Sequence, residues 1–92
     1  FAIDRDMQQG QWAELGMFIN AVMLLAREQG LHTAAIGAWS LWHKTVRAAL
    51  KLPDELNLYC GMGTGHADLS APLNAIRQPR ADLSDFAVFD GF

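Results

Sequence analysis

The side chains of this sequence that could do chemistry are few, and their spacing suits neither catalysis nor metal binding. His32, His43 and His66 are not spaced as metal ligands, so we expect surface or loop histidines. Cys60 is the single cysteine and lies in an apolar stretch, which favours an inert core residue over a nucleophile. We therefore name no catalytic side chain and no metal site.

Glycines and arginines in the second half of the chain are the remaining candidates. Gly61, Gly63 and Gly65 alternate, lack the G-x-x-G step and precede no helical pattern, which argues against a dinucleotide-binding loop. Arg77 and Arg80 stand in a polar segment, where arginines are ordinarily solvated surface charges. Residue type alone therefore assigns none of these groups to an active site.

A long helix is the strongest structural prediction. Apolar residues follow helical spacing over residues 11–29, and Gly30 is the expected left-handed stop, with Arg27 favourably placed at the carboxy-terminal end of the dipole. The opposite face is also apolar, so we expect a helix that is buried all round. The residues of that second face are Met17, Phe18, Ala21, Leu24 and Leu25.

The other elements are shorter. We expect an irregular lead-in over residues 1–10 and a connecting segment over 31–39 with a turn at Gly37. Ser40 is the expected N-cap of a second helix over residues 40–51, with Arg47 among its solvent-facing residues and Pro53 in the exit turn. One short core strand is expected over residues 56–65, followed by an arm over 66–92 that ends in an unpaired strand.

Composition limits the possible functions. Ninety-two residues form one small domain at most, yet 51% are hydrophobic, so we expect part of this surface to pack against a partner or a longer chain. The opening at Phe1 also suggests a fragment. A net charge of -3 without a basic stripe gives no support for nucleic-acid binding. No stretch is long and apolar enough to span a membrane, and we expect a reduced, intracellular protein.

Several segments, taken in order, resemble one known family over nearly the whole chain. They are residues 11–18 (QWAELGMF), 23–27 (MLLAR), 45–50 (TVRAAL), 60–65 (CGMGTG), Arg80 and 86–92 (FAVFDGF). Each is weak alone, whereas their order and spacing are specific. The chain is similar to the carboxy-terminal half of the FMN-dependent nitroreductases.

The resemblance implies an α+β homodimer, of which this chain would be the carboxy-terminal portion. It places the helix over 11–29 at the dimer interface and the FMN sites between subunits. The terminal arm would cross to the partner and extend its sheet. The implied localisation is cytoplasmic, with no membrane or nucleic-acid partner.

The resemblance also implies cofactor-binding residues. The segment Ala35, Ile36, Gly37 and Ala38 would hold the flavin ring through backbone groups, with an N–H near Gly37 directed at flavin N5. Common family patterns have Pro and Glu where this sequence has Ala35 and Gly37. Basic residues of the arm would grip the FMN phosphate, and Arg77 and Arg80 are the candidates, because guanidinium groups suit phosphate.

The implied activity is hydride transfer from NAD(P)H to a nitro compound, a quinone or a similar acceptor. An alternative is a non-catalytic dimerisation or interaction module derived from such an enzyme. A third hypothesis is a protein that stores or senses flavin without turnover.

Overall fold

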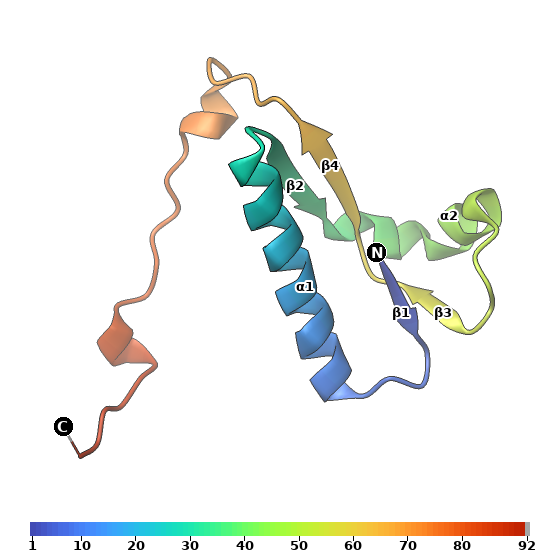
Figure 1. The fold of residues 1–92 in the computed structure, drawn as a ribbon, viewed down its shortest axis with the longest axis horizontal. Helices are drawn as coiled ribbons and strands as arrows, with labels where there is room; N and C mark the ends of the chain where they lie inside the picture. Colours follow the sequence, from blue (N-terminus) through green and yellow to red (C-terminus); the bar gives the residue numbers. More distant parts are fainter. Residues whose placement is uncertain (92) are drawn as a thin grey trace.

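The computed structural model describes residues 1–91, so Phe92 of the predicted terminal strand lies outside the described residues. Helices and strands alternate along the chain, with three short 3-10 helices (η) between or after them (Figure 1). The elements are β1 (Ala2–Asp4), α1 (Gln9–Glu28), β2 (His32–Ile36), η1 (Gly37–Trp42), α2 (His43–Leu50), β3 (Leu56–Leu58), β4 (Gly61–Gly65), η2 (Pro72–Ala75) and η3 (Leu83–Asp85).

The long helix α1 is present and begins two residues earlier than the periodicity predicted. The backbone N–H of Gln8 donates to the side chain of Gln11 at 3.3 Å, which secures the first turn. At the other end Gly30 has φ +75°, and the N–H of Leu31 donates to the carbonyl of Ala26 at 2.9 Å. The left-handed stop at Gly30 is therefore confirmed.

The strands form two antiparallel pairs, β1 with β3 and β2 with β4. Ala2 is opposite Leu58 in the first pair, and Ile36 is opposite Gly61 in the second. Both pairings join segments that are far apart in the sequence. The chain therefore acquires its sheet hydrogen bonds only when these distant segments meet.

Three sequence predictions about the segments that form strands were wrong. Residues 1–10 contain β1 rather than an irregular lead-in, and residues 31–39 contain β2 and the start of η1 rather than a connection. The single core strand over 56–65 is two strands, which change partner at Tyr59 and Cys60. Strands of three to five residues carry too little alternation to be recognised locally, so their partners decide where they form.

The second helix also differs from its prediction. Residues 37–42 form η1, and α2 begins only at His43. The hydroxyl of Ser40 donates backwards to the carbonyl of Gly37 at 2.7 Å, so Ser40 closes a turn of η1 and is not an N-cap. The predicted exit turn at Pro53 is present, with the N–H of Leu56 donating to the Pro53 carbonyl.

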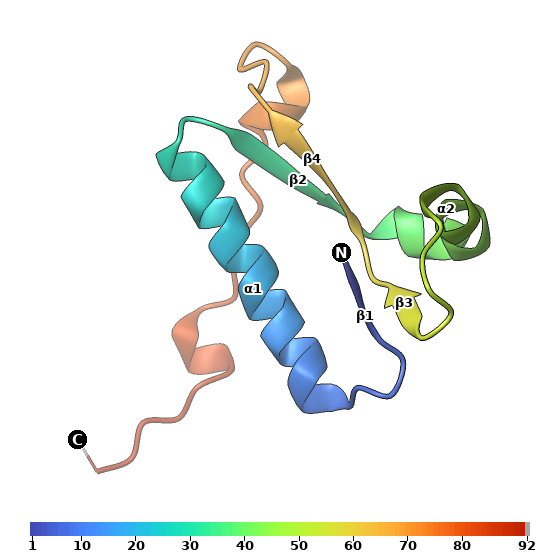
Figure 2. The ribbon, with the colours of Figure 1, turned by 45° about the vertical axis from the view of Figure 1, so that its right-hand side comes forward.

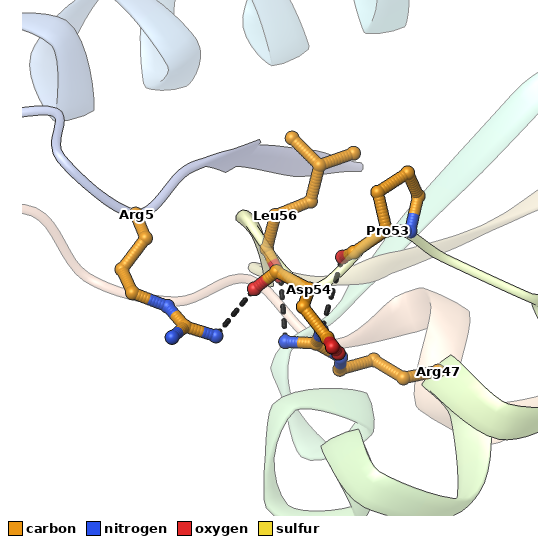
Figure 3. Close-up of polar contacts among 5 residues, drawn as sticks. All are labelled: Arg5, Arg47, Pro53, Asp54 and Leu56. Carbon is orange, nitrogen blue, oxygen red and sulfur yellow. Dashed lines mark hydrogen bonds and ion pairs between the residues drawn. The ribbon is translucent and has the colours of Figure 1, made fainter.

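Arg47 was expected to face solvent, and this prediction was wrong. Its side chain is 15% exposed and lies under the loop that follows α2. Figure 3 shows its guanidinium donating to the carbonyls of Pro53 and Leu56 and to the Asp54 carboxylate, at 2.8 to 3.0 Å. Arg5 donates to the backbone carbonyl of Asp54 from the other side. The two arginines therefore tie β1 and α2 to the segment leading into β3.

The arm begins after β4 and leaves the rest of the molecule (Figures 1 and 2). Within residues 66–91 it contains η2 and η3 but no strand, so the predicted terminal strand is not formed in this chain. A strand needs a neighbouring strand to accept its backbone hydrogen bonds, and the strands described within residues 1–91 pair only as β1 with β3 and β2 with β4. Near its start, hydrogen bonds from the Ser70 hydroxyl and backbone N–H hold the pKa of Asp68 below its ordinary value.

The core is small. Ile19 of α1 and Cys60 between β3 and β4 are the most buried apolar side chains described, at 7% and 4% exposure. The prediction that α1 is buried all round was wrong for this chain taken alone, because no second layer covers the outer face. Met17, Phe18, Leu24 and Leu25 on that face are more than half exposed. The prediction of an inert, buried position for Cys60 agrees with its burial.

Candidate functional site

An apolar cleft of about 430 Å³ lies against the small core. Four parts of the chain form it: one face of α1, the end of β2, the start of η1, and the link between β3 and β4. Three of these parts therefore come from the first half of the chain, and only the link between β3 and β4 comes from the second half. The lining residues are Gly16, Ile19, Ala35, Gly37, Ser40, Tyr59 and Cys60.

Small residues keep this cleft open. Gly16 and Ile19 are three positions apart on α1 and so share one face of the helix. A Cβ at Gly16 or Gly37 would meet no other atom within 4 Å, so both positions border open space. On the other side, the ring of Tyr59 packs edge-on against Trp12, with ring centroids 5.8 Å apart, which fixes one end of the wall. The result is a mainly apolar recess.

Gly37, at the start of η1, brings backbone polar groups to this recess. The hydroxyl of Ser40 occupies the carbonyl of Gly37 at 2.7 Å. The first N–H groups of a helix have no partner within it, so those of Gly37 and Ala38 are not used by η1. The lining residue Gly37 therefore has a backbone N–H that η1 does not use.

The structure brings together only part of the predicted site. Ala35 and Gly37 both line the cleft. Ile36 and Ala38 belong to the same segment but do not line it, and side-chain alternation along β2 directs Ile36 away from its neighbour Ala35. Trp39, which follows the segment, also lies outside the lining set.

The two arginines of the predicted site are not at the cleft. Arg77 and Arg80 lie between η2 and η3, in the extended part of the arm (Figure 1). Both are exposed, and Arg80 donates only a long 3.4 Å bond to the neighbouring Pro79 carbonyl. Within a single chain, neither guanidinium therefore lines the cleft.

Sequence reasoning missed five of the lining residues, namely Gly16, Ile19, Ser40, Tyr59 and Cys60. Gly16 carried a usable signal, since a glycine on the apolar face of a long helix marks a close approach or a gap. Tyr59 and Cys60 carried none, because their place depends on the change of strand partner between β3 and β4.

A second hollow of about 480 Å³ beside α2 collects four of the seven lysines and arginines of the chain. Two of the four, Arg5 and Arg47, are already bonded to backbone carbonyls of the adjoining loop. The arginines of this hollow therefore bind the loop that connects α2 to β3. Among residues 1–91, no group of three or more His, Cys, Asp or Glu side chains could hold a metal ion. Nor does any helix described here have the length and apolar character needed to cross a membrane.

Comparison with known proteins decides the family. Residues 2–66 match the sequence profile of the Nitroreductase family. The chain belongs to the nitroreductase family. This nitroreductase-family chain is 34% identical, over its full 92 residues, to 4-nitrobenzoate reductase of Pseudomonas putida, of which it covers 40%. It is 36% identical over 89 residues to chloronitrobenzene nitroreductase of Comamonas testosteroni, of which it covers 39%.

Solved structures give the same result for the fold. The FMN and NADPH-dependent nitroreductase NfnB from Sphigopyxis sp. strain HMH superposes on 99% of the nitroreductase-family chain with a TM-score of 0.94 and 40% identity. The FMN-dependent NfnB from Mycobacterium smegmatis, solved in complex with NADPH, gives 0.92 at 27% identity over 98% of the chain. The matched region is 41% and 40% of those two proteins. The α+β nitroreductase fold is therefore confirmed, for a chain spanning about two fifths of its relatives' length.

Proposed function

We propose that this chain is the carboxy-terminal half of an FMN-dependent NAD(P)H oxidoreductase that reduces nitro compounds, quinones or similar acceptors. The observation that carries the proposal is the cleft at Ala35 and Gly37, the segment that the family resemblance had assigned to the flavin ring. Relatives named as nitroaromatic reductases, and neighbours described as FMN-dependent, support it.

The recess has the chemistry that a flavin ring requires. Ile19 and Ala35 supply an apolar wall, and the glycines at 16 and 37 leave room for a flat aromatic system. Backbone N–H groups at the start of η1 supply donors for the polar edge of the ring. A flavin held by these residues would supply the hydride and electron transfer between a nicotinamide and the acceptor. The part of this chain is to bind and orient the ring and to exclude water from one side.

Phosphate binding is proposed for Arg77 and Arg80, within a dimer. Neither arginine lines the cleft of its own chain, and the arm that bears them lies apart from the body. We infer that the arm crosses to a second subunit, where a guanidinium can meet the phosphate of a cofactor bound there. This proposal makes the enzyme a cytoplasmic homodimer with no nucleic-acid or membrane partner.

The alternative is a dimerisation module without catalysis. The separation of both arginines from the cleft favours it, because a chain without a phosphate grip would bind FMN weakly. It predicts a stable dimer of the full-length protein that purifies without flavin and shows no NAD(P)H oxidation.

The test is FMN titration of the full-length protein, followed by flavin fluorescence, with two matched glycine variants. Gly16→Leu places a side chain in the cleft, whereas Gly10→Leu places the same side chain on α1 outside it, and both positions have open space. We expect Gly16→Leu to weaken FMN binding about tenfold or more, since a leucine occupies space that the ring requires. Gly10→Leu should stay within about twofold.

Equal affinity in both variants would contradict a flavin site at this cleft. Steady oxidation of NAD(P)H with a nitroaromatic acceptor would exclude flavin storage or sensing. A wild-type protein that is dimeric but binds no FMN would establish the dimerisation module instead.

A further inference from the structure

The indole of Trp39 rests on the backbone of Gly61. A Cβ at position 61 would lie 2.8 Å from Cδ2, 2.9 Å from Cε2 and 3.0 Å from Cγ of the tryptophan ring. Three adjoining ring atoms at nearly equal distances mean that the face of the ring covers the Cα of Gly61. Real Cβ atoms do not approach so closely, so any side chain at position 61 would displace the indole.

The strand itself does not require glycine here. Gly63 lies two residues further along β4, on the same face, because side chains alternate along a strand. A Cβ at Gly63 would meet its nearest neighbour, the carbonyl oxygen of Ala34, at 3.9 Å, which is ordinary contact. The tryptophan ring above Gly61 therefore distinguishes it from Gly63.

This contact lies where the cleft wall begins. Gly61 is opposite Ile36, the last residue of β2, and η1 starts at the next residue, Gly37. Trp39 is two positions further on, inside η1, and Ser40 closes the turn back to Gly37. The ring thus joins η1 to β4, and β4 is itself bonded to β2. Movement of the indole would carry the backbone of Gly37 with it.

We propose that Trp39 is a positioning residue for the cofactor cleft, and that Gly61 is its required seat. Trp39 is not among the residues that line the cleft. The indole sets the distance between η1 and β4. It thereby sets the position of the Gly37 backbone, which in this proposal faces the flavin. This inference rests on the proposed function of the cleft as a flavin site. The contact between Trp39 and Gly61 is the one that positions the backbone of Gly37.

The experiment compares Gly61→Ala with Gly63→Ala in the full-length protein. Gly61→Ala should weaken FMN binding about tenfold or more and shift the visible absorption of bound flavin, since displacements near 1 Å disturb aligned groups strongly. Gly63→Ala should leave affinity within about twofold and the spectrum unchanged. A role confined to folding would lower the unfolding temperature in Gly61→Ala without altering the spectrum of flavin bound to the folded protein.

A double-mutant cycle separates the ring from the glycine. Trp39→Ala should also weaken FMN binding, because η1 loses its support. Adding Gly61→Ala to Trp39→Ala should have no further effect, since the alanine methyl then has nothing to displace. Should Gly61→Ala fold poorly, this pairing also restores folding. Additive effects, or unchanged FMN affinity and spectrum in Gly61→Ala, would overturn the proposal.

Different results would overturn the flavin cleft and the role of Trp39. A wild-type protein that binds no FMN would overturn the proposed function. Wild-type binding that Gly61→Ala leaves intact would overturn the role of Trp39 and leave the flavin cleft standing.

Discussion

Arg47 shows how much one side chain can organise in this molecule. Its guanidinium serves two backbone carbonyls and the Asp54 carboxylate (Figure 3). The Asp54 carboxylate is fully exposed, so the ion pair itself contributes little. The bonds to Pro53 and Leu56 matter more, because they fix the turn that delivers the chain into β3. Arg47 is therefore a structural residue.

Replacing Arg47 by methionine should destabilise the full-length protein by about 1 to 3 kcal/mol, because carbonyls that lose a charged donor are left partly unsatisfied. Lys44→Met is the matched control on the same helix, since no polar contact of the Lys44 side chain exists among the described residues. Urea denaturation measures both. An equal loss in the two variants would show that the Arg47 bonds do not stabilise the turn.

The backbone is strained at Lys51, the residue that ends α2. Lys51 has φ 53° and ψ 41°, the left-handed conformation in which glycine usually ends a helix. Its N–H donates to the carbonyl of Ala48, so the conformation is held in place by the cap. A residue with a Cβ pays steric energy there that glycine does not.

Lys51→Gly should therefore stabilise the full-length protein by about 0.5 to 1 kcal/mol, the relief of strain less the added flexibility of the unfolded chain. Lys44→Gly, within the same helix, should instead destabilise it by about 1 kcal/mol. Thermal or urea unfolding of both variants checks the pair. A loss of stability in Lys51→Gly would show that the cap is not strained.

The molecule exposes more surface than its size explains. Its accessible area is 7735 Å², whereas a folded monomer of this mass should expose about 5,300 Å². Its radius of gyration is 17.0 Å against about 12 Å for a compact chain of this length. The excess accessible area is comparable to the area that an obligate interface buries. Exposed apolar residues of α1 and of the arm account for much of it, which supports the proposal that another subunit or chain segment covers them.

Leu25→Glu should weaken the proposed dimer at least about tenfold, because its side chain, 62% exposed in this chain, would become a buried and unpaired carboxylate. Gln29→Glu adds the same charge at an exposed position just past α1 and should leave association unchanged. Sedimentation velocity of the full-length variants measures the association. A dimer that tolerates Leu25→Glu as well as Gln29→Glu would place the interface elsewhere.

The sequence by itself determined α1 and its stop at Gly30, the exit turn at Pro53, and the family. These depend on short-range physics, such as helical periodicity and turn conformations, or on ordered motifs. The proposed role of Ala35 and Gly37 in one site came from the resemblance and stays a prediction. Only the tertiary structure decided that β1 and β2 are strands, that residues 56–65 change partner at Tyr59 and Cys60, and that Trp39 sits on Gly61. Those features arise from contacts between residues 22 to 56 positions apart, from Trp39 and Gly61 to Ala2 and Leu58, which no local pattern contains.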